Sequence, residues 1–127
     1  MGDKRQLAQI LRSELTFLEQ GAYRRSERYP WRPNFVFEDS STCINFFYHG
    51  HTEPRPCEEC PLIEFVPQDH RYARFPCRHI NLTERGETVN SFYEYGTQEE
   101  LEAALGHWLR RTIQQLEAEE STHVQAA

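Results

Sequence analysis

The sequence predicts an α+β domain in which a small, mainly antiparallel sheet of about four short strands is flanked by an amphipathic helix at each end of the chain. Three observations lead to this prediction. Apolar residues recur at helical spacing near both ends, short β-rich runs fill the middle, and four cysteines lie in that loop-rich middle. At 127 residues, we expect residues 1–127 to form a single domain whose central loop is stabilised by a four-cysteine metal site.

The N-terminal helix is predicted within residues 1–20, over residues 4–19. Its apolar side chains are spaced by three and four residues, which places them on one face of a helix: Leu7, Ile10, Leu11, Leu15 and Leu18. Gly21 follows directly and is a typical residue just beyond a helix end.

The C-terminal helix is predicted within residues 96–118. Thr97 and Glu100 have the spacing of a capping box, in which each side chain bonds the backbone of the other residue. The apolar stripe that follows consists of Leu101, Leu105, Trp108, Leu109, Ile113 and Leu116. Residues 119–127 are polar and small, so we expect a frayed tail there.

Residues 34–95 are predicted to form the cysteine-containing, β-rich core. Its expected strands, which are rich in aromatic and β-branched residues, are 34–38, 43–48, 77–82 and 88–95. The last two flank a turn at 83–86 and should form a hairpin. The apolar run at 62–66 receives no assignment.

Four cysteines are the strongest functional signal in the chain. Cys57 and Cys60 form a CxxC unit, which can present two sulfurs to one tetrahedral ion at about 2.3 Å. Cys43 and Cys77 begin two of the expected strands and would supply the other two thiolates. We therefore predict a closed, structural zinc site, with disulfides, a redox-active pair or simply buried thiols as alternatives.

An iron–sulfur cluster is the alternative cofactor. Consecutive cysteines are separated by 13, 2 and 16 residues, and this set resembles, in rotated order, the spacing of high-potential iron–sulfur proteins. The run 56–62, PCEECPL, is also similar to cysteine-bearing PAS sensor modules. These resemblances imply an alternative role as a redox protein or sensor.

Three histidines are candidate replacements for a cysteine ligand or supporting residues of the site. His49 and His51 would lie on one face of an extended backbone, and His79 lies two residues beyond Cys77. The alternative is that these imidazoles are ordinary solvated side chains.

The connector at residues 21–33 mixes arginine with aromatic residues. We predict a partner-binding surface from its side chains, Arg24, Arg25, Arg28, Trp31 and Arg32, because these residue types dominate interface hot spots. The alternative is a linker that packs its rings on the core. The net charge of −6 favours a protein or acidic peptide over nucleic acid as the partner, and a homodimer is a further alternative.

The remaining features narrow the class of protein. We find no apolar run long enough to span a bilayer and no signal-peptide pattern, so we expect no membrane partner and a cytoplasmic location. The chain has no recognised catalytic frame, and four cysteines would close a zinc site to water. We therefore predict a non-catalytic interaction or regulatory module and name no catalytic residue; a small metal-dependent enzyme is the second alternative.

Overall fold

The structure is a computed structural model that describes residues 4–24, 30–45 and 55–126. Its α-helices are α1 (Lys4–Glu19), α2 (Val89–Tyr95) and α3 (Gln98–Ala126), and its short 3-10 helices are η1 (Cys57–Glu59), η2 (Pro61–Phe65), η3 (Gln68–His70) and η4 (Pro76–His79). Within these residues the chain forms no β-strand, and a single antiparallel bridge joins Asn81 to Thr88.

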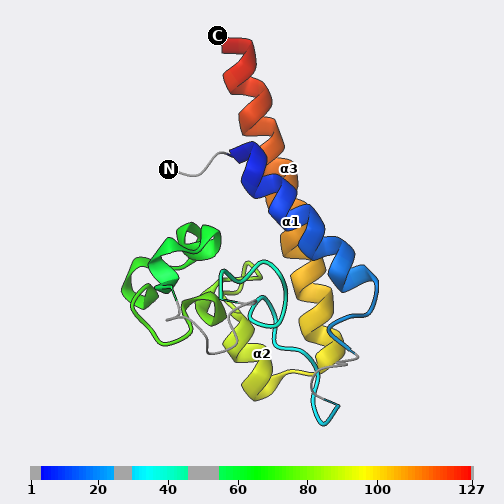
Figure 1. The fold of residues 1–127 in the computed structure, drawn as a ribbon. Helices are drawn as coiled ribbons and strands as arrows, with labels where there is room; N and C mark the ends of the chain where they lie inside the picture. The colour runs from blue at the N-terminus through cyan, green and yellow to red at the C-terminus, as the bar shows by residue number, and fades with distance from the viewer. Residues whose placement is uncertain (1–3, 25–29, 46–54, 127) are drawn as a thin grey trace.

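The first and last helices pack side by side and run antiparallel (Figure 1). Ion pairs mark the alignment at three levels, because Lys4 contacts Glu119 at 2.9 Å, Arg12 contacts Glu117 at 2.6 Å and Glu19 contacts Arg110 at 3.1 Å. All these charged groups are exposed, so the pairs define the register and add little stability.

The core lies where these two helices meet the middle of the chain. The buried residues of α1 are Leu7, Ala8, Leu11, Glu14 and Leu18, and those of α3 include Leu101, Leu105, Leu109, Ile113 and Leu116. Trp108 of α3 extends the core toward the cysteine-containing region, since its ring contacts Phe37 and Phe65 edge to face. The middle of the chain is thereby packed on one end of the helical pair (Figure 1).

Both predicted terminal helices are confirmed. Gly21 ends α1 with φ of 77°, a conformation that glycine adopts at little cost. The capping box of α3 is present, because Thr97 N–H donates to Glu100 Oε1 at 2.8 Å and Glu100 N–H donates to Thr97 Oγ1 at 3.1 Å. Helix α3 continues to Ala126, so the frayed tail predicted after residue 118 is wrong over most of its length.

The predicted α+β fold with a four-strand sheet is wrong for the described residues. The expected strand at 34–38 is a turn, because the Asp39 carboxylate accepts the Phe35 N–H at 2.7 Å and Phe37 has a positive φ of 65°. Residues 43–45 of the next expected strand also form turns, and residues 46–48 lie outside the described residues. Side-chain hydrogen bonds to nearby backbone have replaced strand pairing here.

The predicted hairpin is also wrong. Residues 89–95 form helix α2, in which Thr88 and Ser91 make a reciprocal capping box. Val89 is fully buried and Phe92 and Tyr93 pack against the core, which is the i, i+3, i+4 pattern of one helical face. The expected strand at 77–82 is reduced to η4 and the single bridge, although Ile80 and Leu82 are both buried.

Candidate metal centre

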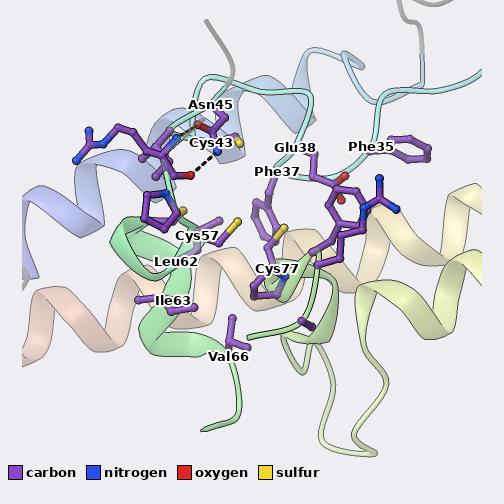
Figure 2. A pocket seen from close by; sticks show the side chains of 18 of the residues that line it. Phe35, Phe37, Glu38, Cys43, Asn45, Cys57, Leu62, Ile63, Val66 and Cys77 are labelled. Carbon is purple, nitrogen blue, oxygen red and sulfur yellow. Dashed lines mark hydrogen bonds between the residues drawn. The ribbon is translucent and has the colours of Figure 1, made fainter. Parts of the chain in front are cut away.

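The four cysteines, all free thiols, line one cavity of about 660 Å³. The cavity lies where the turn that carries Cys43 faces η1 and η4, which carry Cys57 and Cys77, and Cys60, which lies between η1 and η2. Figure 2 shows that Cys43, Cys57 and Cys77 reach this space from different segments of the chain. Thiols separated by up to 34 positions in the sequence therefore meet around one space.

Local sequence features place each thiol. Cys57 begins η1, and Cys60 lies between η1 and η2, where its N–H donates to the Cys57 carbonyl at 3.0 Å. η2 and η4 each begin with a proline. Proline lacks a backbone N–H, and the N–H at the first position of a helix would have no partner within the helix, so proline fits there at no cost. The second of these prolines directly precedes Cys77. Cys43 belongs to a turn closed by its own N–H, which donates to the Ser40 carbonyl at 3.1 Å.

The surroundings of the thiols are largely apolar. The cavity wall includes Phe37, Leu62, Ile63 and Val66, and three of these side chains are almost fully buried. Glu38 supplies a carboxylate to the same wall (Figure 2). Apolar walls exclude water and strengthen electrostatic interactions inside the site.

Burial raises the pKa of all four thiols; backbone hydrogen bonds partly offset the rise for Cys43 and Cys60, and nearby negative charges add to it. For Cys77 the next causes are the Glu38 carboxylate and then the other three cysteines. For Cys57 the next cause is Cys43, and for Cys60 both Cys43 and Cys57 contribute. The thiols are thus near enough to influence one another, and they hold their protons tightly until a cation offsets the charge.

The thiols surround the cavity without converging on one point. Within the described ranges, no three His, Cys, Asp or Glu side chains are arranged closely enough to form a ready ligand set for a metal ion. A single zinc ion would therefore require the segments around the cavity to close inward. The donor set itself, four thiols and a nearby carboxylate, is chemically suited to zinc and to iron–sulfur clusters.

A second feature at the cavity, the pair of Arg78 with Glu38, was not predicted. Arg78 Nε and its terminal nitrogen donate to the two Glu38 carboxylate oxygens at 2.7 and 2.9 Å. The same guanidinium lies over the rings of Phe75 at 4.3 Å and Phe35 at 4.9 Å. The pair ties the segment before Cys43 to the helix that carries Cys77. Its partners are 40 positions apart, and no sequence pattern connects them.

The predicted supporting histidines are only partly described. His49 and His51 lie outside the described residues. The ring of His79 stacks on His70 with centroids 4.1 Å apart and planes 2° from parallel. Burial and then His70 lower the pKa of His79. The contact joins η3 to η4, and a role of His79 in supporting a metal ligand stays a prediction.

Of the connector residues predicted to bind a partner, the structure describes Arg24, Trp31 and Arg32. Arg25 and Arg28 lie outside the described residues. Arg24 pairs with Glu102 of α3 at 3.1 Å, and Arg32 pairs with Asp39 at 2.8 Å and lies on the Phe35 ring. These contacts agree with the alternative of a packed linker. The Trp31 side chain is not packed on the core in this way, since 74% of the residue's surface is exposed.

Comparisons with models of protein families, with curated proteins and with solved structures find no match in any of the three. The described helices include none with the length and apolar character needed to cross a membrane.

Proposed function

We propose that this chain binds one zinc ion through Cys43, Cys57, Cys60 and Cys77, and that the ion stabilises the middle of the chain. The observation that carries the proposal is that all four thiols line the same cavity, although they come from separate segments. A shared site requires Cys43 and Cys77 to face the same space as the CxxC unit, and this arrangement meets that requirement.

The architecture of the middle region supports a structural role for the ion. Residues 55–82 consist mainly of short 3-10 helices and turns, and 3-10 helices have poorer hydrogen-bond geometry than α-helices. A zinc ion that cross-links η1, η4 and the Cys43 turn would supply stability that this region lacks. Four thiolate ligands would leave no position for substrate or water, so we propose a non-catalytic centre.

The biological role that we propose is that of a protein-interaction or regulatory module in the cytoplasm. A reducing compartment keeps four cysteines as thiols that can bind metal. We propose that the exposed Trp31 and the largely exposed Arg24 contact another protein or an acidic peptide. The net charge of −6 disfavours nucleic acid as the partner.

The test is elemental mass spectrometry of the protein purified without oxygen or added metal. We expect about one zinc per wild-type chain and almost none in Cys60→Ser, because three thiolates bind zinc more weakly than four. Glu64→Gln is the matched control, because Glu64 is exposed in η2 and does not line the cavity. Equal zinc contents in wild type and Cys60→Ser would exclude the proposed site.

An iron–sulfur cluster is the second candidate, and it would make the chain a redox protein or sensor. The observation that favours it is that the thiols line the cavity without meeting at one point, since a cluster holds its thiolates farther apart than one ion does. Iron and acid-labile sulfide in the anaerobic protein, with visible absorption that Cys60→Ser lacks, would replace the zinc assignment.

A further inference from the structure

A carboxylate lies buried in the apolar face of α1. Glu14 is 1% exposed and shares its helical face with Leu11 and Leu18. A buried carboxylate is strongly destabilising unless hydrogen bonds replace the water that it loses. Its position therefore requires specific partners from outside the helix.

Three hydroxyl groups supply those hydrogen bonds. Ser40 Oγ and Thr42 Oγ1 donate to Glu14 Oε1 at 2.7 and 2.6 Å, and the Tyr23 hydroxyl donates to Oε2. All three hydroxyl-bearing residues are themselves buried. Hydrogen bonds to a charged acceptor are shorter and stronger than neutral ones, so this group is a firm anchor.

The anchored hydroxyls lie on the turn that leads into Cys43. Ser40 Oγ also accepts the Thr42 N–H at 3.4 Å, and the Ser40 carbonyl accepts the Cys43 N–H at 3.1 Å. The backbone of Cys43 is thus held through residues that are bonded directly to the Glu14 carboxylate.

The Glu14 carboxylate also supports the beginning of this turn, at Phe37, through the Tyr23 hydroxyl. The Tyr23 hydroxyl, which donates to Glu14, accepts the Phe37 N–H at 2.9 Å. Phe37 has a φ of 65°, which is uncommon for a residue other than glycine and requires support from its surroundings. Glu14 therefore fixes the turn at both ends.

We propose that Glu14 is the positioning residue for Cys43, and this role rests on the proposed metal centre. The other thiols have local supports, because Cys57 and Cys60 share one turn and Cys77 belongs to η4. Cys43 lies on irregular backbone: the Glu14 carboxylate and its hydroxyl partners anchor the residues before it, and Asn45, which is hydrogen-bonded to the Arg55 backbone, anchors the residues after it. Glu14 itself does not line the cavity, so it acts through the turn.

Two readouts on Glu14→Gln test the proposal. A glutamine amide has one acceptor oxygen and cannot accept all three hydroxyl protons. We expect zinc affinity, measured by competition with a chromophoric chelator, to fall about 10- to 100-fold, as for other residues that orient metal ligands. In the metal-free protein we expect iodoacetamide to label Cys43 several-fold faster relative to Cys77, as read by mass spectrometry.

Leu116→Ala is the matched control, because Leu116 is buried on α3 and does not line the cavity, so we expect its truncation to destabilise the fold without selective exposure of Cys43. Thr42→Val removes one donor at nearly constant volume and is the second variant should Glu14→Gln fail to fold; it should shift both readouts in the same direction. If Cys43 labels at the same relative rate in Glu14→Gln or Thr42→Val as in Leu116→Ala, Glu14 is not a positioning residue. Selective Cys43 labelling in a protein that binds no metal would instead support the positioning and overturn the metal centre.

Discussion

The helical pair and the cysteine region of this chain are held together in different ways. Helices α1 and α3 bury a regular stripe of aliphatic side chains along their contact. The described residues of this region, 30–45 and 55–82, bury fewer such side chains and make individual polar contacts, such as Arg78 with Glu38 and Ser40 with Glu14. Continuous apolar burial stabilises the helical pair by itself, whereas the cysteine region depends on a few specific polar contacts as well. An added metal would therefore matter most to the second region.

The largest expected effect is the removal of metal. Structural zinc contributes on the order of 10 kcal/mol in small domains, and here that contribution should fall on one region. We expect amide hydrogen exchange of peptides from residues 55–82 to accelerate strongly after treatment with a chelator, while peptides from α1 and α3 change little. Equal acceleration in α1 and in residues 55–82 would show that the two regions are a single cooperative unit.

Truncation of matched leucines compares the packing of the two regions. Leu109 in the helical pair and Leu62 in η2 are both fully or almost fully buried. Leu109→Ala should lower the free energy of unfolding by about 2–5 kcal/mol in urea titrations. Leu62→Ala should cost less, because Leu62 already borders the cavity. A larger loss for Leu62→Ala would mean that the cysteine region carries the main core.

Replacement of Arg78 by lysine tests the polar contacts of the cysteine region. Lysine keeps the charge but loses the two-point contact with Glu38 and the stacking on Phe35 and Phe75. We expect a loss of about 1–3 kcal/mol, measured by thermal unfolding. Arg74→Lys is the control, since Arg74 lies over an exposed ring at 5.4 Å, and it should change stability by less than about 0.5 kcal/mol.

The smallest expected effect concerns pH. Burial, and then the charge of Glu14, raise the pKa of Tyr23 well above its usual value. Because the folded protein holds this proton more tightly than the unfolded chain, its contribution to stability is complete below about pH 10 and is lost as the pH rises further.

Tyr23→Phe provides the measurement. The difference in unfolding free energy between wild type and Tyr23→Phe should shrink above about pH 10, by at most about 1.4 kcal/mol per pH unit. Tyr93 and the four cysteines are common to both proteins, so their titration cancels. Parallel stability curves from pH 9 to pH 11 would contradict the assignment.

The helical pair could be predicted from sequence because its signals are local. Spacing of leucines and the Thr97–Glu100 box identify α3 without knowledge of any distant contact. Residues 89–95 show the limit, since their aromatic and β-branched content favours a strand while the spacing of Val89, Phe92 and Tyr93 fits a helix. Burial of Val89, Phe92 and Tyr93 against the core, together with the Thr88 cap, favours the helix over the strand.

The candidate site was predictable only in part. The cysteine spacing led us to expect one shared site, and the four thiols do line one cavity, whereas metal binding itself stays a prediction. Glu14 could have been noticed, because it continues the helical spacing of Leu7, Leu11 and Leu18. The pairing of Arg78 with Glu38 could not, because a contact between two irregular segments has no periodic signature.

The pairing of the first helix with the last has a consequence for how quickly the chain folds. Contacts such as Arg12 with Glu117 join positions 105 residues apart, and Arg110 with Glu19 join positions 91 apart. Closing so long a loop lowers the entropy of the chain before the helices bury any apolar surface against each other. This helical hairpin should therefore assemble far more slowly than one with a short connection. Cross-linking of the intervening residues by a bound ion would shorten the effective loop, and metal loading should then accelerate the refolding of helices that the ion never touches.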